Sequence, residues 1–246
     1  MASSGAMLLP RGDTAYRGGR GRGVFWGGNN GSFQNIIQYI TISTTGNALD
    51  FGDLGAASTG GGSCASATRG LYGGGQNPSQ TDTIEYITIS STGNAFDFGN
   101  SRRTKDFLKA LSDSTRGVFA GGRNPAPATY RSEIDFVTIA SLGNTSDFGE
   151  LVGARAFMSQ GVSSPTRGLF AGGANAPGVD DNVIQYITIA TLGNALDFGD
   201  LTQITGDNIA GASSSTRGLF AGGETPGPAL TNVISYVTIA SLGDAI

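Results

Sequence analysis

Histidine, the residue most used for acid–base and nucleophilic catalysis near neutral pH, does not occur in this chain. A Ser-His or Cys-His pair and a histidine metal ligand are therefore excluded. The single cysteine, Cys64, cannot form an internal disulfide or a cysteine-based zinc site. Most Asp and Glu residues sit at repeated positions, so no carboxylate pair stands out as the acid and base of a glycosidase. We predict that the chain is not an enzyme and has no catalytic residue, metal ligand or cofactor.

Five segments of variable sequence, each following a Gly-Gly pair, supply the candidate binding residues. They contain six of the eight prolines, and proline lowers the entropy that a loop loses when a partner holds it. Tyr and Arg are the types most often found as interface anchors. We expect the segments at 123–133 and 224–232 to dominate attachment, the alternative being that all five are mere spacers. The candidate partner-binding residues are Arg123, Pro125, Pro127, Tyr130, Arg131, Pro226 and Pro228.

One arginine begins each of five copies of the segment Arg-Gly-apolar-aromatic-x-Gly-Gly. A guanidinium carries five hydrogen-bond donors, so one arginine can tie several backbone carbonyls together. We predict this structural use, with the five side chains in a ring on one face; a site for an anion or a partner is the alternative. The repeat arginines are Arg22, Arg69, Arg116, Arg167 and Arg217.

Two basic clusters are candidates for contact with DNA. Residues 17–23 read RGGRGRG, which resembles an RNA-binding segment, although Arg22 also belongs to the repeat. The second cluster, at 102–109, contains Arg102, Arg103, Lys105 and Lys109, and is either a solvated connection or a basic patch facing DNA or an acidic protein. Because the net charge is −4 and the pI near 4.7, the composition disfavours general nucleic-acid binding.

The elements that must position these residues follow from an internal repeat. Successive repeat arginines are 47, 47, 51 and 50 residues apart. Each is followed by a segment rich in β-branched and aromatic residues, which is typical of a strand. These segments are apolar on both alternating faces, as expected for a sheet covered on both sides. They are IIQYITIS at 36–43, TIEYITIS at 83–90, EIDFVTIA at 133–140, VIQYITIA at 183–190 and VISYVTIA at 233–240.

Two further segments complete each unit. A Gly-Asn pair predicts a turn, because both residues adopt positive φ at low cost, and we interpret the asparagines 47, 94, 144 and 194 as turn formers. The Asp-Phe-Gly that follows predicts an outer strand whose glycine allows a bend or bulge. Small residues precede each Arg-Gly, as suits an innermost strand near an axis.

Four short strands per unit and a period of about 40–50 residues predict a β-propeller. The order of segments resembles the kelch repeat, with Phe51, Phe98, Phe148 and Phe198 where kelch has a tryptophan. We therefore expect an all-β, five-bladed, kelch-like propeller with four-stranded blades, a single domain over residues 1–246; a solenoid ranks second. Residues 1–9, with Met7, Leu8 and Leu9, are expected to close the ring as the outer strand of the last blade.

The phrases YITIA-x-x-GNA-x-DFGDL and STRGLFAGG resemble repeats in virion proteins of tailed phages from marine and freshwater bacteria, over nearly the whole chain. The resemblance implies a non-enzymatic structural part of the virion, docked on capsid or tail, assembled in the host bacterial cytoplasm and in part host-facing. Its partners would be other virion proteins. The alternative is a lectin-like propeller for a host surface glycan, although Phe33 and Tyr130 form no repeated aromatic site. The sequence has no run of 18 apolar residues, so we expect no membrane partner.

Overall fold

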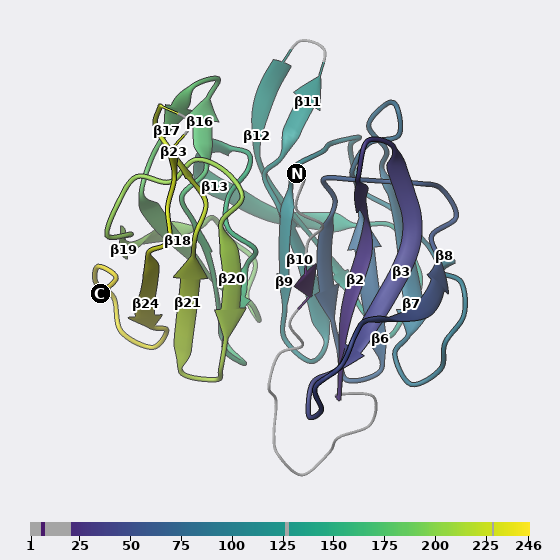
Figure 1. Cartoon of the computed structure of the whole chain (residues 1–246). Helices are drawn as coiled ribbons and strands as arrows, with labels where there is room; N and C mark the ends of the chain where they lie inside the picture. Colours follow the sequence, from purple (N-terminus) through teal and green to yellow (C-terminus); the bar gives the residue numbers. More distant parts are fainter. Residues whose placement is uncertain (1–5, 8–20, 126–127, 228) are drawn as a thin grey trace.

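A computed structural model describes residues 6–7, 21–125, 128–227 and 229–246. Its β-strands form five small antiparallel sheets arranged in a ring, the blades of a β-propeller (Figure 1). The predicted all-β, five-bladed propeller is confirmed. No helix in the described part of the chain has the length and hydrophobicity needed to cross a membrane.

Each blade begins at the axis with its inner strand and continues outward. Blade 1 comprises β1 (Ala6–Met7), β2 (Arg22–Asn29), β3 (Phe33–Thr41) and β4 (Leu49–Asp53). Blade 2 comprises β5 (Gly62–Ala65), β6 (Arg69–Gly73), β7 (Thr83–Thr88) and β8 (Phe96–Asn100). Blade 3 comprises β9 (Lys109–Ser112), β10 (Arg116–Ala120), β12 (Ala128–Thr138) and β13 (Ser146–Arg155), and β11 (Arg123–Pro125) pairs with the start of β12.

Blades 4 and 5 each carry an additional short hairpin. Blade 4 comprises β14 (Val162–Ser163), β15 (Arg167–Ala171), β18 (Val183–Thr188) and β19 (Leu196–Asp200), with the hairpin β16 (Ala174–Ala176) and β17 (Val179–Asp180). Blade 5 comprises β20 (Ala210–Ser213), β21 (Arg217–Ala221) and β24 (Ile234–Thr238), with the hairpin β22 (Glu224–Thr225) and β23 (Ala229–Leu230). Ile246 exchanges two backbone hydrogen bonds with Tyr236 on the outer side of β24.

The expected placement of the N-terminal strand is wrong for the residues that the structure describes. Ala6 and Met7 form β1, which pairs with Phe25 and Val24 as the inner strand of blade 1, and not as the outer strand of blade 5. The segment between β1 and β2 is longer than the three-residue connection between β5 and β6, so counting residues back from Arg22 misplaces the strand. Residues 1–5, Leu8 and Leu9 lie outside the described residues.

The two-sided apolar strands pack blade against blade, as the sequence predicts. Blade 4, for example, presents Leu169 and Ile184 to Phe220 and Val237 of blade 5. Four buried clusters of this kind join blades 1 to 2, 2 to 3, 3 to 4 and 4 to 5. The phenylalanines of the outer strands, Phe51, Phe98, Phe148 and Phe198, are buried at these junctions.

The Gly-Asn turns connect blades. Gly143 of blade 3 donates its backbone N–H to Phe98 of β8 (2.8 Å), and Asn144 Oδ1 accepts from the backbone N–H of Asn100 (2.9 Å). The same contacts recur at the turns of blades 2 and 4. They recur also at the turn of blade 5, where Asp244 takes the place of the asparagine. Positive φ is confined to the glycine of each turn, so the asparagines act through their side chains and not through an unusual backbone conformation.

The glycine of Asp-Phe-Gly is in the predicted bulge. Gly99 has φ of 145° beside a register shift between β7 and β8, and a Cβ there would lie 2.4 Å from the Gly143 carbonyl oxygen. Only glycine permits the turn of one blade to approach the outer strand of the blade before it this closely.

All the variable segments after Gly-Gly lie at one end of the ring, the upper end in Figure 1, where β11, β16, β17 and β23 are found. We call this end the loop face. The Arg-Gly hairpins and the Gly-Asn turns lie at the opposite end.

Candidate functional site

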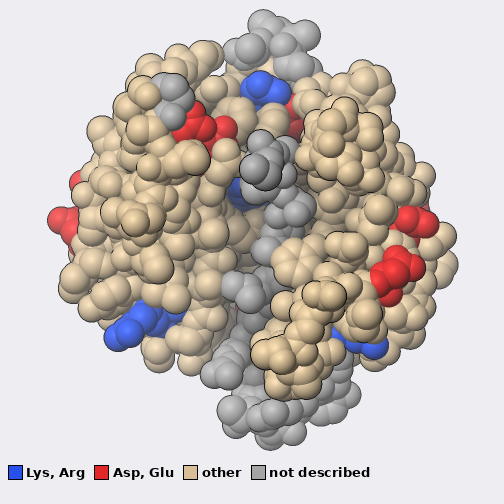
Figure 2. Space-filling model, viewed as in Figure 1, with Lys and Arg blue, Asp and Glu red and all other residues tan. Residues whose placement is uncertain are grey.

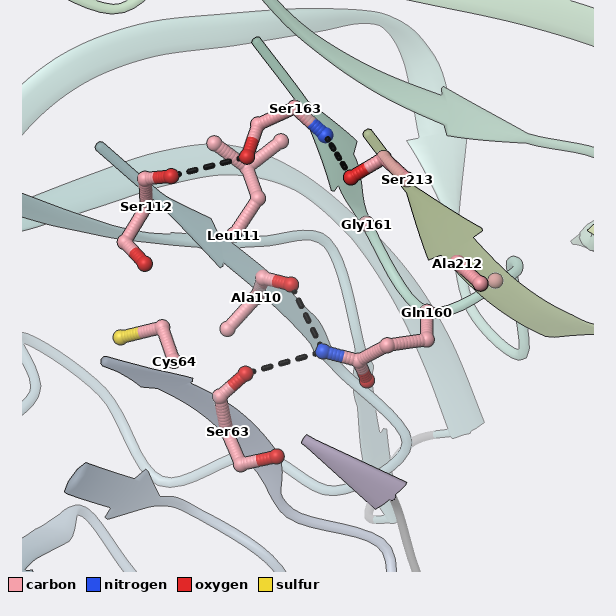
Figure 3. Close-up of a pocket in the computed structure, with 11 residues that line it drawn as sticks. Ser63, Cys64, Ala110, Leu111, Ser112, Gln160, Gly161, Ser163, Ala212 and Ser213 are labelled. Carbon is pink, nitrogen blue, oxygen red and sulfur yellow. Dashed lines mark hydrogen bonds between the residues drawn. The ribbon is translucent and has the colours of Figure 1, made fainter. Parts of the chain in front are cut away.

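The centre of the ring is crossed by hydrogen bonds (Figure 3). Gln160 reaches over the axis from blade 4, and its Nε2 donates to the backbone oxygens of Ser63 in blade 2 (2.9 Å) and Ala110 in blade 3 (2.8 Å). Ser163 Oγ donates to the backbone oxygen of Ser112 (2.8 Å). The cavity among these inner strands has a volume of about 20 Å³, enough for about one water molecule. This cavity among the described inner strands of blades 2 to 5 is therefore too small for a substrate or a glycan.

The loop face carries a more developed site, built on Arg123. This residue pairs with Tyr130 across the β11–β12 hairpin. Its Nε and Nη2 donate to the two carboxylate oxygens of Asp106, at 3.1 and 3.0 Å, and Gln80 Nε2 donates to the same carboxylate at 2.8 Å. Asp106 is fully buried, whereas the Arg123 side chain is 30% exposed. A two-pronged ion pair to a buried carboxylate holds the guanidinium in one orientation.

Two phenylalanines lie beneath this guanidinium. The Arg123 guanidinium carbon is 4.9 Å from the ring centre of Phe107 and 5.6 Å from that of Phe157, and the two rings are 4.4 Å apart. Tyr130 meets Phe157 edge-on, with ring centres 6.1 Å apart. These side chains come from blades 3 and 4 and are half-buried. We call Arg123, Tyr130, Phe107 and Phe157 the aromatic cluster.

The backbone beneath the aromatic cluster is strained. Phe107 and Phe157 have φ of 51° and 62°, in the left-handed region that bulky residues rarely adopt. The corresponding places in blades 2 and 5 hold Gly60 and Asn208, which reach that region at lower cost. Strained backbone of this kind concentrates at functional sites. The aromatic rings are therefore kept at two positions where the fold favours a different residue.

Acidic side chains from blades 4 and 5 stand near the cluster. Burial raises the pKa of Asp207, and the charges of Glu224 and Asp180 raise it further, against a hydrogen bond from Asn208 and the charge of Lys109. Burial and the charge of Glu224 likewise raise the pKa of Asp180. Among the residues that the structure describes, no group of acidic and cysteine side chains is arranged to hold a metal ion. In Figure 2, acidic and basic atoms lie close together at the upper rim.

The structure brings together only some of the predicted partner-binding residues. Arg123 and Tyr130 meet in the aromatic cluster. Arg131 hydrogen-bonds through its backbone to Gly122, and its side chain lies 3.9 Å from Glu133. Pro226 is exposed in the turn between β22 and β23, and Pro125 ends β11. Pro127 and Pro228 lie outside the described residues.

Phe107, Phe157 and Asp106 are absent from the predicted site. A signal for the phenylalanines was available, because a large aromatic residue follows Asp106 where Gly60 follows Thr59 in the preceding unit. No local pattern showed that the two rings meet, since they belong to different repeats.

The basic cluster at 102–109 is largely paired with acids. Lys105 is buried, and its Nζ lies 2.8 Å from Asp135, which also accepts from Arg102. Arg103 lies 3.2 Å from Glu133. Lys105 is thus not part of a solvated connection, and Arg102, Arg103 and Lys105 each have an acidic partner. Contact of this cluster with DNA stays a prediction.

The repeat arginines lie between neighbouring blades. Arg167 donates from Nη1 to the backbone oxygen of Ile239 in blade 5 (2.8 Å), while its guanidinium lies over Tyr186 of its own blade (4.6 Å). Arg22, Arg69 and Arg116 make the same pair of contacts. Arg217 lies over Tyr236, and no hydrogen bond joins it to an isoleucine carbonyl of another described blade. An additional role for this ring in binding a partner stays a prediction.

The chain matches no protein-family model and no curated protein.

Proposed function

We propose that the chain is a non-enzymatic structural module that docks onto a protein partner through its loop face. The aromatic cluster carries this proposal. An arginine fixed by a buried carboxylate, a tyrosine and two phenylalanines in contact form a rigid, half-buried surface of residue types that are enriched at protein interfaces. The cost of ordering these side chains has already been met in the free protein, which favours tight docking.

We further propose that the partner is another protein of a phage virion, on capsid or tail. The resemblance of the repeat phrases to phage virion proteins supports this assignment. The same repeats support a kelch-like unit with four strands as its full complement, as in the sheets of blades 1 and 2.

The test is incorporation into particles. Tyr130→Ala combined with Arg131→Ala should reduce the amount of this chain in purified particles by about tenfold or more, since truncation of an anchor residue such as Tyr130 costs about 2 kcal/mol or more. The circular dichroism spectrum should not change. The matched control is Leu142→Ala with Leu192→Ala, which truncates two exposed leucines beside the Gly-Asn turns at the opposite end. Normal incorporation of the Tyr130 and Arg131 variant, or its loss in the control, would place the docking surface elsewhere.

A glycan-binding function is the second candidate, and the aromatic cluster also favours it. Aromatic faces beside carboxylates suit a sugar ring, and Asp180 and Asp207 lie near Tyr130. Polysaccharide from the host surface is titrated into the unmodified protein and into the Tyr130→Ala variant, and the two binding curves are compared. Loss of polysaccharide binding with normal incorporation into particles would favour the glycan.

A further inference from the structure

A short β-bridge recurs on the loop face in blades 2 to 5. In each blade, the residue that follows the Gly-Gly pair is bonded to the segment that leads into the inner strand. Of these four pairs, the one in blade 5 sets two acidic residues opposite each other. The pairs are Thr59 with Gln76, Asp106 with Arg123, Ala156 with Ala174, and Asp207 with Glu224.

The bridges of blades 3 and 5 have similar backbone bonds and different charges. In blade 3, the Arg123 N–H donates to the Asp106 carbonyl oxygen at 2.7 Å. In blade 5, the Glu224 N–H donates to the Asp207 carbonyl oxygen at 2.9 Å. The residue after the aspartate has a positive φ in both bridges. The arginine of blade 3 neutralises its aspartate, whereas blade 5 holds a second carboxylate in the place of that arginine.

Burial and acidic neighbours act on Asp207 in the same direction. Burial is the largest cause that raises the pKa of Asp207, and the charges of Glu224 in β22 and Asp180 in β17 raise it further. A hydrogen bond from the Asn208 N–H, at 2.9 Å, lowers it. The Asp180 carboxylate also lies against Gly206, where a side chain would collide with it. Carboxylates from blades 4 and 5 are therefore brought together at this bridge.

Basic groups near the bridge leave it without an ion pair among the described residues. Lys109 of β9 lowers the pKa of Asp207 through its charge. Arg123 and Tyr130, of the β11–β12 hairpin, also lie close enough for the charge of Asp207 to raise the pKa of each. No described cation forms an ion pair with Asp207 or Glu224.

We propose that the bridge between Asp207 and Glu224 is a pH-sensitive latch, which holds the start of the β22–β23 hairpin more firmly in acid than at neutral pH. A carboxyl group whose pKa is raised in the closed bridge favours closure most when it is protonated. Closure is therefore strongest below the ordinary Asp pKa of 3.8. It weakens as the pH rises through the raised pKa of Asp207 and is constant above it. This inference does not depend on the proposed docking function.

Hydrogen exchange of single amides, followed by NMR from about pH 4 to about pH 7, tests the latch in the unmodified protein. The N–H groups of Glu224 and Gly206 both donate across the bridge, the second to the Glu224 carbonyl oxygen at 2.8 Å. After correction for intrinsic rates, their protection should be about threefold lower at neutral pH, a factor typical of like charges opposite each other in a sheet. The amides of Arg123 and Asp106 are the internal control and should keep constant protection.

Two variants separate the latch from a general effect of pH. Asp207→Asn retains an acceptor for the Asn208 N–H and removes the titrating group, so the fall in protection should disappear. Glu224→Arg copies the pair of blade 3 and should also remove the fall, with higher protection at neutral pH than in the unmodified protein. Constant protection of Glu224 in the unmodified protein, an equal fall at the Arg123 amide, or a fall that persists in Asp207→Asn would overturn the proposal.

Discussion

Each repeat arginine of blades 1 to 4 makes two kinds of contact from one side chain. The face of the guanidinium lies on an aromatic ring of its own blade, and its edge donates to the carbonyl of an isoleucine in the next blade. Lysine has neither the flat face nor the fixed fork of donors. Arginine is therefore suited to join two blades where lysine is not.

Arg167→Lys and Arg217→Lys form a matched pair, because both residues lie over a tyrosine and only Arg167 reaches the next blade. We expect Arg167→Lys to lower the free energy of unfolding by about 1–2 kcal/mol, since hydrogen bonds from charged groups contribute about that much. Arg217→Lys should change it by less than about 0.5 kcal/mol. Urea denaturation measures both. Equal losses of unfolding free energy in the two variants would assign the effect to the contact between arginine and tyrosine. If a variant kept its stability but no longer attached to particles, the repeat arginines would belong to the binding site.

At the scale of the element, the Gly-Asn turn is part of the junction rather than a simple reversal of the chain. Its glycine and its asparagine both bond to the outer strand of the blade before it, which protects an edge that would otherwise be open to further pairing. The bulge glycine of that outer strand permits the close approach.

Asn144→Ala and Asn47→Ala test this role, because both asparagines follow the glycine of a turn and, of the two, only Asn144 accepts a hydrogen bond from a described residue of a neighbouring blade. We expect Asn144→Ala to cost about 0.5–1 kcal/mol of unfolding free energy, since the Asn100 N–H loses its protein partner at an exposed position where water can replace it. Asn47→Ala should lower the unfolding free energy by less, because it removes only the preference of asparagine for a turn. Thermal unfolding monitored by circular dichroism measures the difference, and two equal costs would show that the inter-blade bond contributes nothing.

At the scale of the whole molecule, the blades form a row of nearest-neighbour contacts. Among the described residues, buried clusters pack both faces of blade 3 but only the back face of blade 5. In repeat proteins, stability is approximately the sum of unit and interface contributions. Of the junctions that the described residues form, opening blade 5 breaks one and opening blade 3 breaks two.

Hydrogen exchange of β10 and β21 should report this difference. Their sequences, RGVFA and RGLFA, are nearly identical, so their intrinsic exchange rates are nearly equal. We expect the amides of β21 to exchange at least about tenfold faster under native conditions, because blade 5 opens at the lower free-energy cost. Equal protection of the two strands would indicate that the ring unfolds as one cooperative unit with no weak end.

Much of the fold could be predicted from single residues and their spacing. The β-branched run at 183–190, apolar on both faces, identifies a strand covered on both sides, and five such runs define five blades. The Gly-Gly pairs and the Asp-Phe-Gly glycine mark the places where the backbone turns or bulges. The prediction for residues 1–9 was wrong for Ala6 and Met7, because a short strand after a long connection has no register in the sequence.

The candidate site was predicted only in part. Arg123 and Tyr130 could be selected by residue type, but Phe107 and Phe157 become one surface only when blades 3 and 4 lie side by side. The same holds for Asn144, whose partner is 44 residues away. The sequence by itself determined the repeat, the strands and the five blades, because alternation and turn chemistry act within a few residues. The tertiary structure alone decided which faces are covered, which arginines are tied and where the aromatic rings meet, because those contacts join residues from different repeats.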